Sequence, residues 1–192
     1  MENCNNKRRV ILVTDGDRIA KKAVETAALR IGGRCISKSA GNPTPMTGRS
    51  IIELIKQTPY DPVVVMVDDK GNIGMGNGEK VIMDIAKSPD VEILGVIAVA
   101  SNTEGVKGVS VDLSVTKDGN IVKNTVDKYG CIGAGLKIIG DTVDILESID
   151  VPVIVGIGDP GKINGKDCRD KGAPIITKAM KEIIKRSSMH MH

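Results

Sequence analysis

The sequence predicts an α/β fold: a single three-layer α/β/α sandwich with a mainly parallel sheet, carrying a β-hairpin near residues 109–126. Continuous apolar runs rich in valine and isoleucine recur along the chain, as at residues 10–13, 63–67 and 153–155. Such runs are typical of strands that are covered on both faces. Stretches with apolar residues at helical spacing separate them, and this alternation builds a parallel sheet with helices on both sides.

The first half of the chain predicts strands and helices in turn. In chain order we expect a strand at 9–14, a helix at 17–31, a short strand at 34–38, a loop at 39–47, a helix at 48–57, a strand at 63–67, a helix at 78–87 and a strand at 92–100. The helices carry apolar residues on one side, such as Ala23 and Ala27. Gly32, Pro59 and Pro89 stand where these helices end.

The second half opens with a different pattern. Apolar and polar residues alternate over residues 109–116, and Asp118-Gly119 separates them from an extended run at 121–126. Asp-Gly between extended runs is a strong hairpin signal, and strict alternation predicts that one face of the hairpin meets water. We therefore expect this hairpin at an edge of the sheet. A helix near 140–149, a strand at 152–155 and a helix at 174–187 then restore the α/β order.

The composition fits one domain. The chain has 192 residues, 41% of them hydrophobic, which is enough for a single core. We expect a disordered N-terminus at 1–8, one α/β domain at 9–187 and a flexible tail at 188–192. The net charge of +3 is too balanced to imply a nucleic-acid or membrane partner, and the absence of Phe and Trp argues against base stacking. No nucleic-acid partner is expected.

The cysteines and histidines exclude several kinds of site. The four cysteines form no C-x-x-C pair, so neither a zinc site nor a redox motif is predicted. Both histidines lie at the extreme C-terminus, which leaves none for a catalytic triad in the folded body. Any metal would be held by oxygen ligands, so Mg²⁺ or Ca²⁺ is the expected ion. No signal peptide or membrane-spanning run is predicted, and we expect a soluble protein.

Acidic residues and glycines follow several of the predicted strands. Because parallel strands bring their carboxyl ends to one edge, where such folds bind ligands, we expect a polar site there. The candidate metal ligands are Asp15, Asp68 and Asp69. The candidate ligand-binding neighbours are Lys70, Asn72, Glu79, Asn102, Asp159 and Lys162. A purely structural alternative stays open, in which Asp17 caps the following helix and Asp68 solvates a strand end.

Other motifs are weaker. Residues 156–161 match G-x-G-x-x-G, but Pro160 and a polar run follow instead of a helix. The same segment matches a P-loop up to Lys162, yet Ile163 stands where Ser or Thr would bind Mg²⁺. The last helix is basic and amphipathic, which suits either packing on the sheet or binding to an anionic membrane. We favour packing.

A family resemblance rests on segments spread over the chain. These are residues 8–17, 32–37, 41–43, 60–63, 94–103 and 155–159. Together they resemble stage V sporulation protein AE in its soluble form, from about Arg8 to Ser187. The resemblance implies a protein of the forespore and spore, peripheral to the inner membrane. It further implies a role with membrane-embedded proteins that move dipicolinic acid and calcium during spore formation and germination. No catalytic residue is carried over, and we expect an accessory protein rather than an enzyme.

A more distant likeness, to the Toprim domain, implies a Rossmann-like fold and an alternative activity. Asp15-Gly16 would stand at the Glu-Gly motif of that domain, and Asp68 at the first Asp of its Asp-x-Asp motif. Lys70 occupies the position of the second Asp, although Asp69 offers a partial substitute. This likeness gives a first alternative function, a Mg²⁺-dependent phosphoryl-transfer enzyme of the Toprim type. A structural or scaffold protein of the spore is a second alternative, independent of that likeness.

Overall fold

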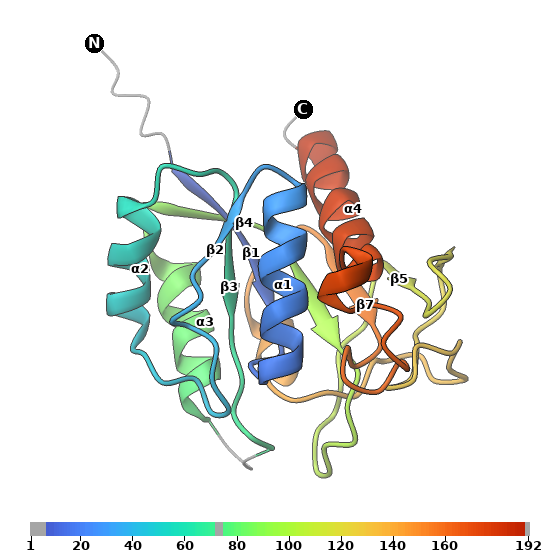
Figure 1. Ribbon diagram of the computed structural model, residues 1–192. Coiled ribbons are helices and arrows are strands. Elements are labelled where there is room, and N and C mark those ends of the chain that lie inside the picture. The colour runs from blue at the N-terminus through green and yellow to red at the C-terminus, as the bar shows by residue number, and fades with distance from the viewer. Residues whose placement is uncertain (1–6, 72–74, 191–192) are drawn as a thin grey trace.

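The computed structural model describes residues 7–71 and 75–190, which form a seven-stranded sheet between two layers of helices (Figure 1). The strands are β1 (Arg8–Val13), β2 (Arg34–Cys35), β3 (Val63–Met66), β4 (Val91–Val99), β5 (Leu113–Val115), β6 (Ile121–Val122) and β7 (Ile154–Ile157). The helices are α1 (Arg18–Arg30), α2 (Gly48–Gln57), α3 (Asn77–Lys87) and α4 (Pro174–His190), with short 3₁₀ helices η1 (Asp144–Ser148) and η2 (Arg169–Lys171). The predicted α/β sandwich is confirmed.

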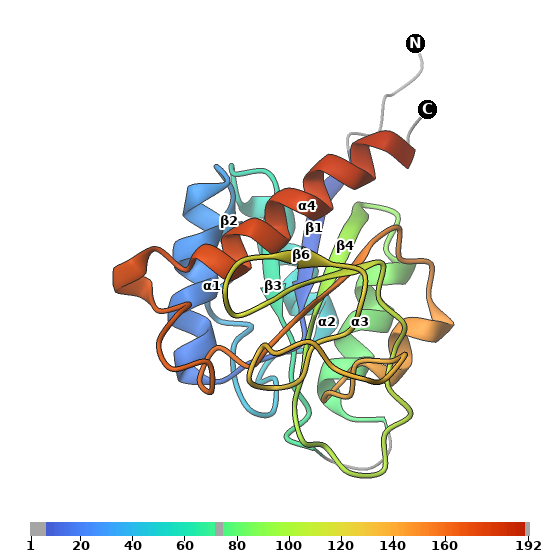
Figure 2. The ribbon, with the colours of Figure 1, turned by 90° about the vertical axis from the view of Figure 1, so that its right-hand side faces the viewer.

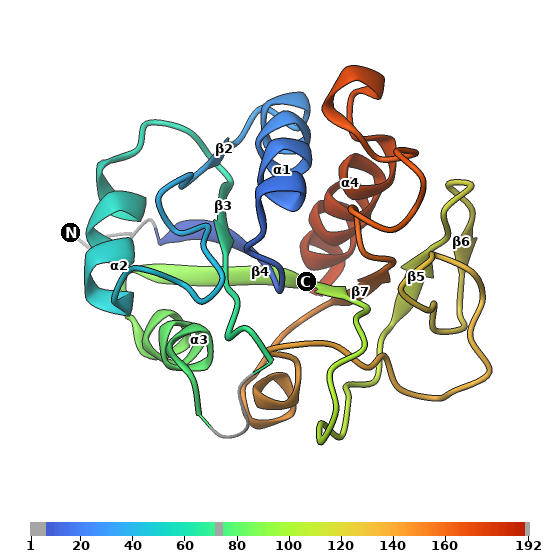
Figure 3. The ribbon, with the colours of Figure 1, turned by 60° about the horizontal axis from the view of Figure 1, so that its bottom comes forward.

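The strand order is β2-β3-β1-β4-β7-β5-β6, and every pair is parallel except β5 with β6. Figure 3 shows α1 and α4 above the sheet and α2 and α3 below it. The central strand β1 packs against both layers, because alternate side chains point to opposite faces. Ile11 and Val13 belong to the core on the α1/α4 side, whereas Val10 and Leu12 belong to the core on the other side.

Helix α4 covers the sheet with its apolar side. Its buried residues include Ile175, Ile176, Ala179, Met180 and Ile183. The helix comes very close to β4 at Gly95, where a Cβ atom would lie 2.8 Å from a methyl carbon of Ile183. The packing role predicted for this helix is confirmed, and the helix continues to His190, beyond the predicted end.

The region after β4 differs most from the prediction. The hairpin exists, but its paired strands β5 and β6 are only three and two residues long. The predicted wet face is wrong at Ser114 and Thr116, which are buried. Ile138, from the loop region that follows the hairpin, lies over the same face as Ser114, because both side chains come within about 3 Å of the Cβ position of Gly156 on β7. The helix predicted near 140–149 is the 3₁₀ helix η1, and β7 begins two residues later than predicted. These loops form the side that faces the viewer in Figure 2.

The two edges of the sheet are its shortest strands. β2 ends the sheet on one side and β6 on the other, each with two residues. Among the residues that the structure describes, no helix is both long and apolar enough to cross a membrane.

Candidate functional site

The candidate site lies at the carboxyl ends of the parallel strands, next to the point where the strand order reverses. The chain leaves β1 toward β2 and β3 on one side, and then crosses to β4 and β7 on the other. The loops that follow β1 and β4 therefore run in opposite directions. In open α/β sheets, ligands commonly bind in the crevice between two such loops. A cavity of about 330 Å³ occupies this place.

Carboxylates outnumber lysines in the lining of this cavity, which we call the acidic cavity. Its aspartates are Asp15, Asp17, Asp68, Asp141 and Asp159. Its lysines are Lys70 and Lys162. Asn102 and the hydroxyl groups of Ser101 and Thr103, which follow β4, complete a lining rich in oxygen atoms. Such a donor set suits a hard cation rather than a soft metal.

Asp15 is the most strongly perturbed group in the cavity. It follows β1 directly, its side chain is 9% exposed, and its Oδ1 accepts a hydrogen bond from the Asp17 backbone N–H at 3.0 Å. Burial raises the pKa of the Asp15 carboxyl from 3.8 to about 8, and the negative charges of Asp17, Asp159 and Asp68 add to this rise. Without a bound cation, Asp15 therefore holds its proton at neutral pH.

Asp17 and Asp159 complete a cluster with Asp15. Oxygen atoms of the three carboxylates all lie within 4.8 Å of one another. Two oxygens bound to one Ca²⁺ are separated by at most about 5 Å, so this spacing allows all three to share an ion. Each also has a structural role: Asp17 accepts hydrogen bonds from Ile19 and Ala20 at the start of α1. Asp159 forms an ion pair with Lys162 at 2.7 Å, and this bond raises the pKa of Lys162.

Asp68 also lines the acidic cavity, just after the end of β3. Its carboxylate accepts hydrogen bonds from the Gly16 N–H at 3.0 Å and from the Lys70 N–H at 2.7 Å, and thereby ties the loops after β1 and β3 together. Burial, followed by the negative charge of the neighbouring Asp141, raises the pKa of Asp68 to about 6, although the hydrogen bonds from these N–H groups lower it. Asp141 also accepts a hydrogen bond from the Gly71 N–H. The cavity thus has a second pair of carboxylates, Asp68 and Asp141, in addition to the first cluster.

Asp69 and Glu79 do not line the acidic cavity. Asp69 is 2% exposed, and its carboxylate accepts hydrogen bonds from the Gly78 and Glu79 N–H groups at 2.5 and 3.0 Å. It therefore caps α3 from the preceding loop, at a helix start where the N-cap residue, Gly76, has no side chain. Burial, followed by the charges of Asp69 and Asp144, raises the pKa of Glu79.

The structure brings most of the predicted site residues together. Those that line the acidic cavity are Asp15, Asp68, Lys70, Asn102, Asp159 and Lys162. Asn72 lies outside the described residues. Asp141, which follows a long irregular excursion, was not predicted from the sequence. Asp17 was a possible neighbour of Asp15 in a carboxylate cluster as well as a helix cap, but it was not among the candidate metal ligands. A larger cavity under residues 125–139 was also missed, since no periodic pattern marks its walls.

Fold and site together define an open α/β sandwich with an acidic cavity at the carboxyl ends of its parallel strands. Comparison with known families goes further. Over residues 9–187 the chain matches the family described as Stage V sporulation protein AE1, and because this match spans nearly the whole chain, the protein belongs to that family. It is thus a sporulation-related protein, as the resemblance implied. No curated protein and no solved structure matches the chain, and the Toprim likeness finds no support.

Proposed function

We propose that this protein is a non-enzymatic accessory of the movement of dipicolinic acid and calcium during spore formation and germination, and that it binds calcium in the acidic cavity. The observation that carries the calcium part is the spacing of the Asp15, Asp17 and Asp159 carboxylates. The dipicolinate part rests on the family. Calcium prefers several carboxylate, carbonyl and amide oxygens in flexible geometry, and Asn102 and Ser101 offer further oxygens in the same cavity.

The two lysines extend this proposal to the organic ligand. Dipicolinate carries two carboxylates around a ring nitrogen, so a calcium–dipicolinate complex presents both a cation and anions. In the acidic cavity, the ion would lie among the aspartates. A free dipicolinate carboxylate would pair with Lys70, or with Lys162 once calcium competes for Asp159. Binding then requires no general base and no bond making.

Partners and location follow as further parts of the proposal. We place the protein in the forespore and spore, peripheral to the inner membrane through membrane-embedded proteins of the same transport set. The packing of the basic helix α4 supports a protein partner over direct lipid binding, because the apolar residues of this helix are buried against the sheet and are not free to enter a bilayer. A variant with both exposed lysines Lys181 and Lys185 changed to Glu should then sediment with anionic vesicles to the same extent as the wild type.

Calorimetry tests the proposal directly. Calcium chloride, dipicolinate and the two together are titrated into the wild type, Asp159→Asn and the control Asp150→Asn, which changes an exposed aspartate that does not line the cavity. We expect calcium to bind, dipicolinate to strengthen its binding, and Asp159→Asn to weaken it on the order of tenfold, since affinity follows the ligand charge count. Equal affinities in all three proteins would refute the site. Normal dipicolinate content and germination in a deletion strain, with altered spore assembly, would favour a scaffold role instead.

A further inference from the structure

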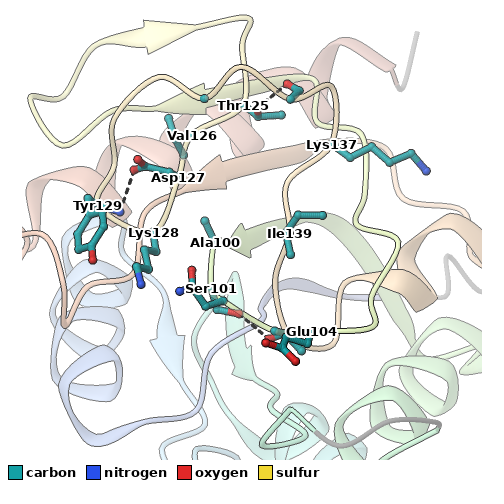
Figure 4. A pocket seen from close by; sticks show the side chains of 14 residues that line it. Ala100, Ser101, Glu104, Thr125, Val126, Asp127, Lys128, Tyr129, Lys137 and Ile139 are labelled. Atoms are coloured by element: carbon teal, nitrogen blue, oxygen red, sulfur yellow. Dashed lines mark hydrogen bonds between the residues drawn. The ribbon is translucent and has the colours of Figure 1, made fainter.

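A second and larger cavity, of about 630 Å³, adjoins the acidic cavity, and we call it the loop cavity (Figure 4). Ser101, Asn102 and Thr103 line both cavities, so the segment after β4 separates them. The volume falls within the range of about 300 to 1,000 Å³ that is typical of small-molecule sites. Nothing in the proposed calcium site uses the far wall of this cavity, which residues 125–139 form.

Hydrogen bonds fix that far wall. The Thr125 hydroxyl donates to the Gly135 carbonyl at 2.7 Å, and the Gly133 N–H donates to the Thr125 carbonyl at 2.8 Å. The Asp127 carboxylate accepts from the Tyr129 and Cys131 N–H groups, both at 2.9 Å. The opposite wall is held where it leaves β4, because the Ala100 N–H donates to the Ile157 carbonyl, the Ser101 N–H donates to the Ile139 carbonyl, and the Ser101 and Thr103 hydroxyl groups share a hydrogen bond. The cavity is therefore built into the fold and largely pre-formed.

The lining combines an apolar middle with three charged groups that form no ion pair among the described residues, Glu104, Asp127 and Lys128, of which Asp127 already accepts two backbone N–H groups. Ala100, Val126 and Ile139 supply the apolar surface. Among the residues that the structure describes, neither Lys128 nor Glu104 forms an ion pair, whereas the other lining lysine, Lys137, pairs with Glu147 outside the cavity. In the view of Figure 4, Lys128 and Glu104 lie on either side of Ser101.

Charge complementarity selects the kind of ligand. A simple anion would pair with Lys128 but would be repelled by Glu104, Asp127 and the aspartates of the adjoining acidic cavity. A simple cation would pair with Glu104 and leave Lys128 without a partner. A molecule that carries both charges satisfies both groups, and an apolar part of the same molecule would displace water from the aliphatic walls.

We propose that the loop cavity binds a small zwitterion with an apolar body, the chemistry of a free aliphatic amino acid or a short apolar peptide. Its carboxylate pairs with Lys128, whose ammonium group lies 5.0 Å from the centre of the Tyr129 ring. Its ammonium group pairs with Glu104, and its body packs on Val126 and Ile139. This site uses none of the carboxylates of the proposed calcium site, although the two cavities share the wall formed by Ser101, Asn102 and Thr103.

Calorimetry with L-leucine and with leucyl-leucine tests this proposal. Two analogues each lack one charge: 4-methylpentanoate has no ammonium group, and leucinamide has no carboxylate. We expect one or both zwitterions to bind, and each analogue to bind about tenfold more weakly or worse, because a charged hydrogen bond is lost. Whichever of L-leucine and leucyl-leucine binds more tightly identifies the source as a free amino acid or a peptide.

Variants locate the binding. Lys128→Met and Glu104→Gln should each weaken the better zwitterion about tenfold, whereas Lys123→Met, a lysine outside the cavity, should not. A cooperative urea unfolding transition like that of the wild type shows that Lys128→Met is folded, and Asp159→Asn should keep zwitterion binding, so the two proposals fail separately. The inference is overturned if neither zwitterion binds at millimolar concentration, if the one-charge analogues bind equally well, or if Lys128→Met binds like the wild type.

Discussion

Replacing Asp15 by Asn should make the protein more stable at alkaline pH. Asn has the same shape, and its oxygen can still accept the hydrogen bond from the Asp17 N–H. It carries no charge, so it avoids burying an ionised carboxylate beside Asp17, Asp159 and Asp68. The structure therefore predicts that the wild type loses stability as Asp15 ionises and that the variant does not.

The size and direction of this loss follow from the pKa shift. The unfolded carboxyl titrates near 3.8 and the folded one near 8, so the folded state keeps a proton that the unfolded state has released. The free energy of unfolding therefore falls as pH rises toward 8, by up to about 1.4 kcal/mol per pH unit for one proton. Between about pH 6 and 8 this loss is worth about 2 kcal/mol for Asp15. Asp68 and Asp167 titrate near 6 and finish ionising in the lower half of the same window, where each adds less than about 0.5 kcal/mol, so the difference between the wild type and Asp15→Asn isolates Asp15.

Urea denaturation in the presence of a chelator measures this loss. Unfolding free energies of the wild type, Asp15→Asn and the control Asp150→Asn are compared across that pH window. We expect the wild type and the control to lose about 2 to 3 kcal/mol, and Asp15→Asn to lose about 2 kcal/mol less than either. Saturating calcium should remove most of the loss in the wild type, because the ion replaces the proton. An unchanged pH slope in Asp15→Asn would refute the reasoning.

Three further substitutions test the fold and the site. Asp69→Ala should lower the unfolding free energy by about 1 to 2 kcal/mol, because α3 loses its cap. Its calcium affinity, measured by calorimetry, should be nearly unchanged. A large loss of affinity would place Asp69 among the calcium ligands. Gly95→Ala should cost about 1 to 3 kcal/mol in chemical denaturation, because its Cβ would lie 2.6 Å from the Val153 carbonyl oxygen. Ile183→Ala, at a fully buried position of α4, should cost about 2 to 5 kcal/mol in the same assay, and a loss below 1 kcal/mol would contradict the packing described for this helix.

The regular part of the fold could be predicted from the sequence, since it depends on local patterns. The helix predicted at 48–57 has those bounds in the structure, and β1, β3 and β4 lie within a residue of their predicted ends. The pattern failed at Ser114, whose alternation with apolar neighbours indicated exposure. Its burial follows from the long-range packing of Ile138 over the same face, which sequence periodicity does not encode.

Residues of the candidate site could be predicted only where they directly follow the end of a strand. Asp15, Asp68 and Asp159 each follow a strand end, so parallel pairing alone brings them to one edge. Asp141 reaches the same cavity by an irregular loop, and nothing in its neighbourhood signals that path. Asp69 shows the reverse failure: it stands next to Asp68 in sequence, but alternate direction along the chain turns it toward the N–H groups of α3.

The edge strands of the sheet, β2 and β6, have only two residues each, and this limits how copies of the protein can associate edge to edge. An exposed strand offers free N–H and C=O groups along which another chain can add, and long flat edges of this kind are where domain swapping and fibril growth begin. Here each border offers such groups over only two residues. Exposed lysine and arginine side chains at Lys123 and Arg34 further oppose the approach of an identical border. Crowded copies of this protein should therefore resist fusing their sheets, and should stay individually folded at high local concentration.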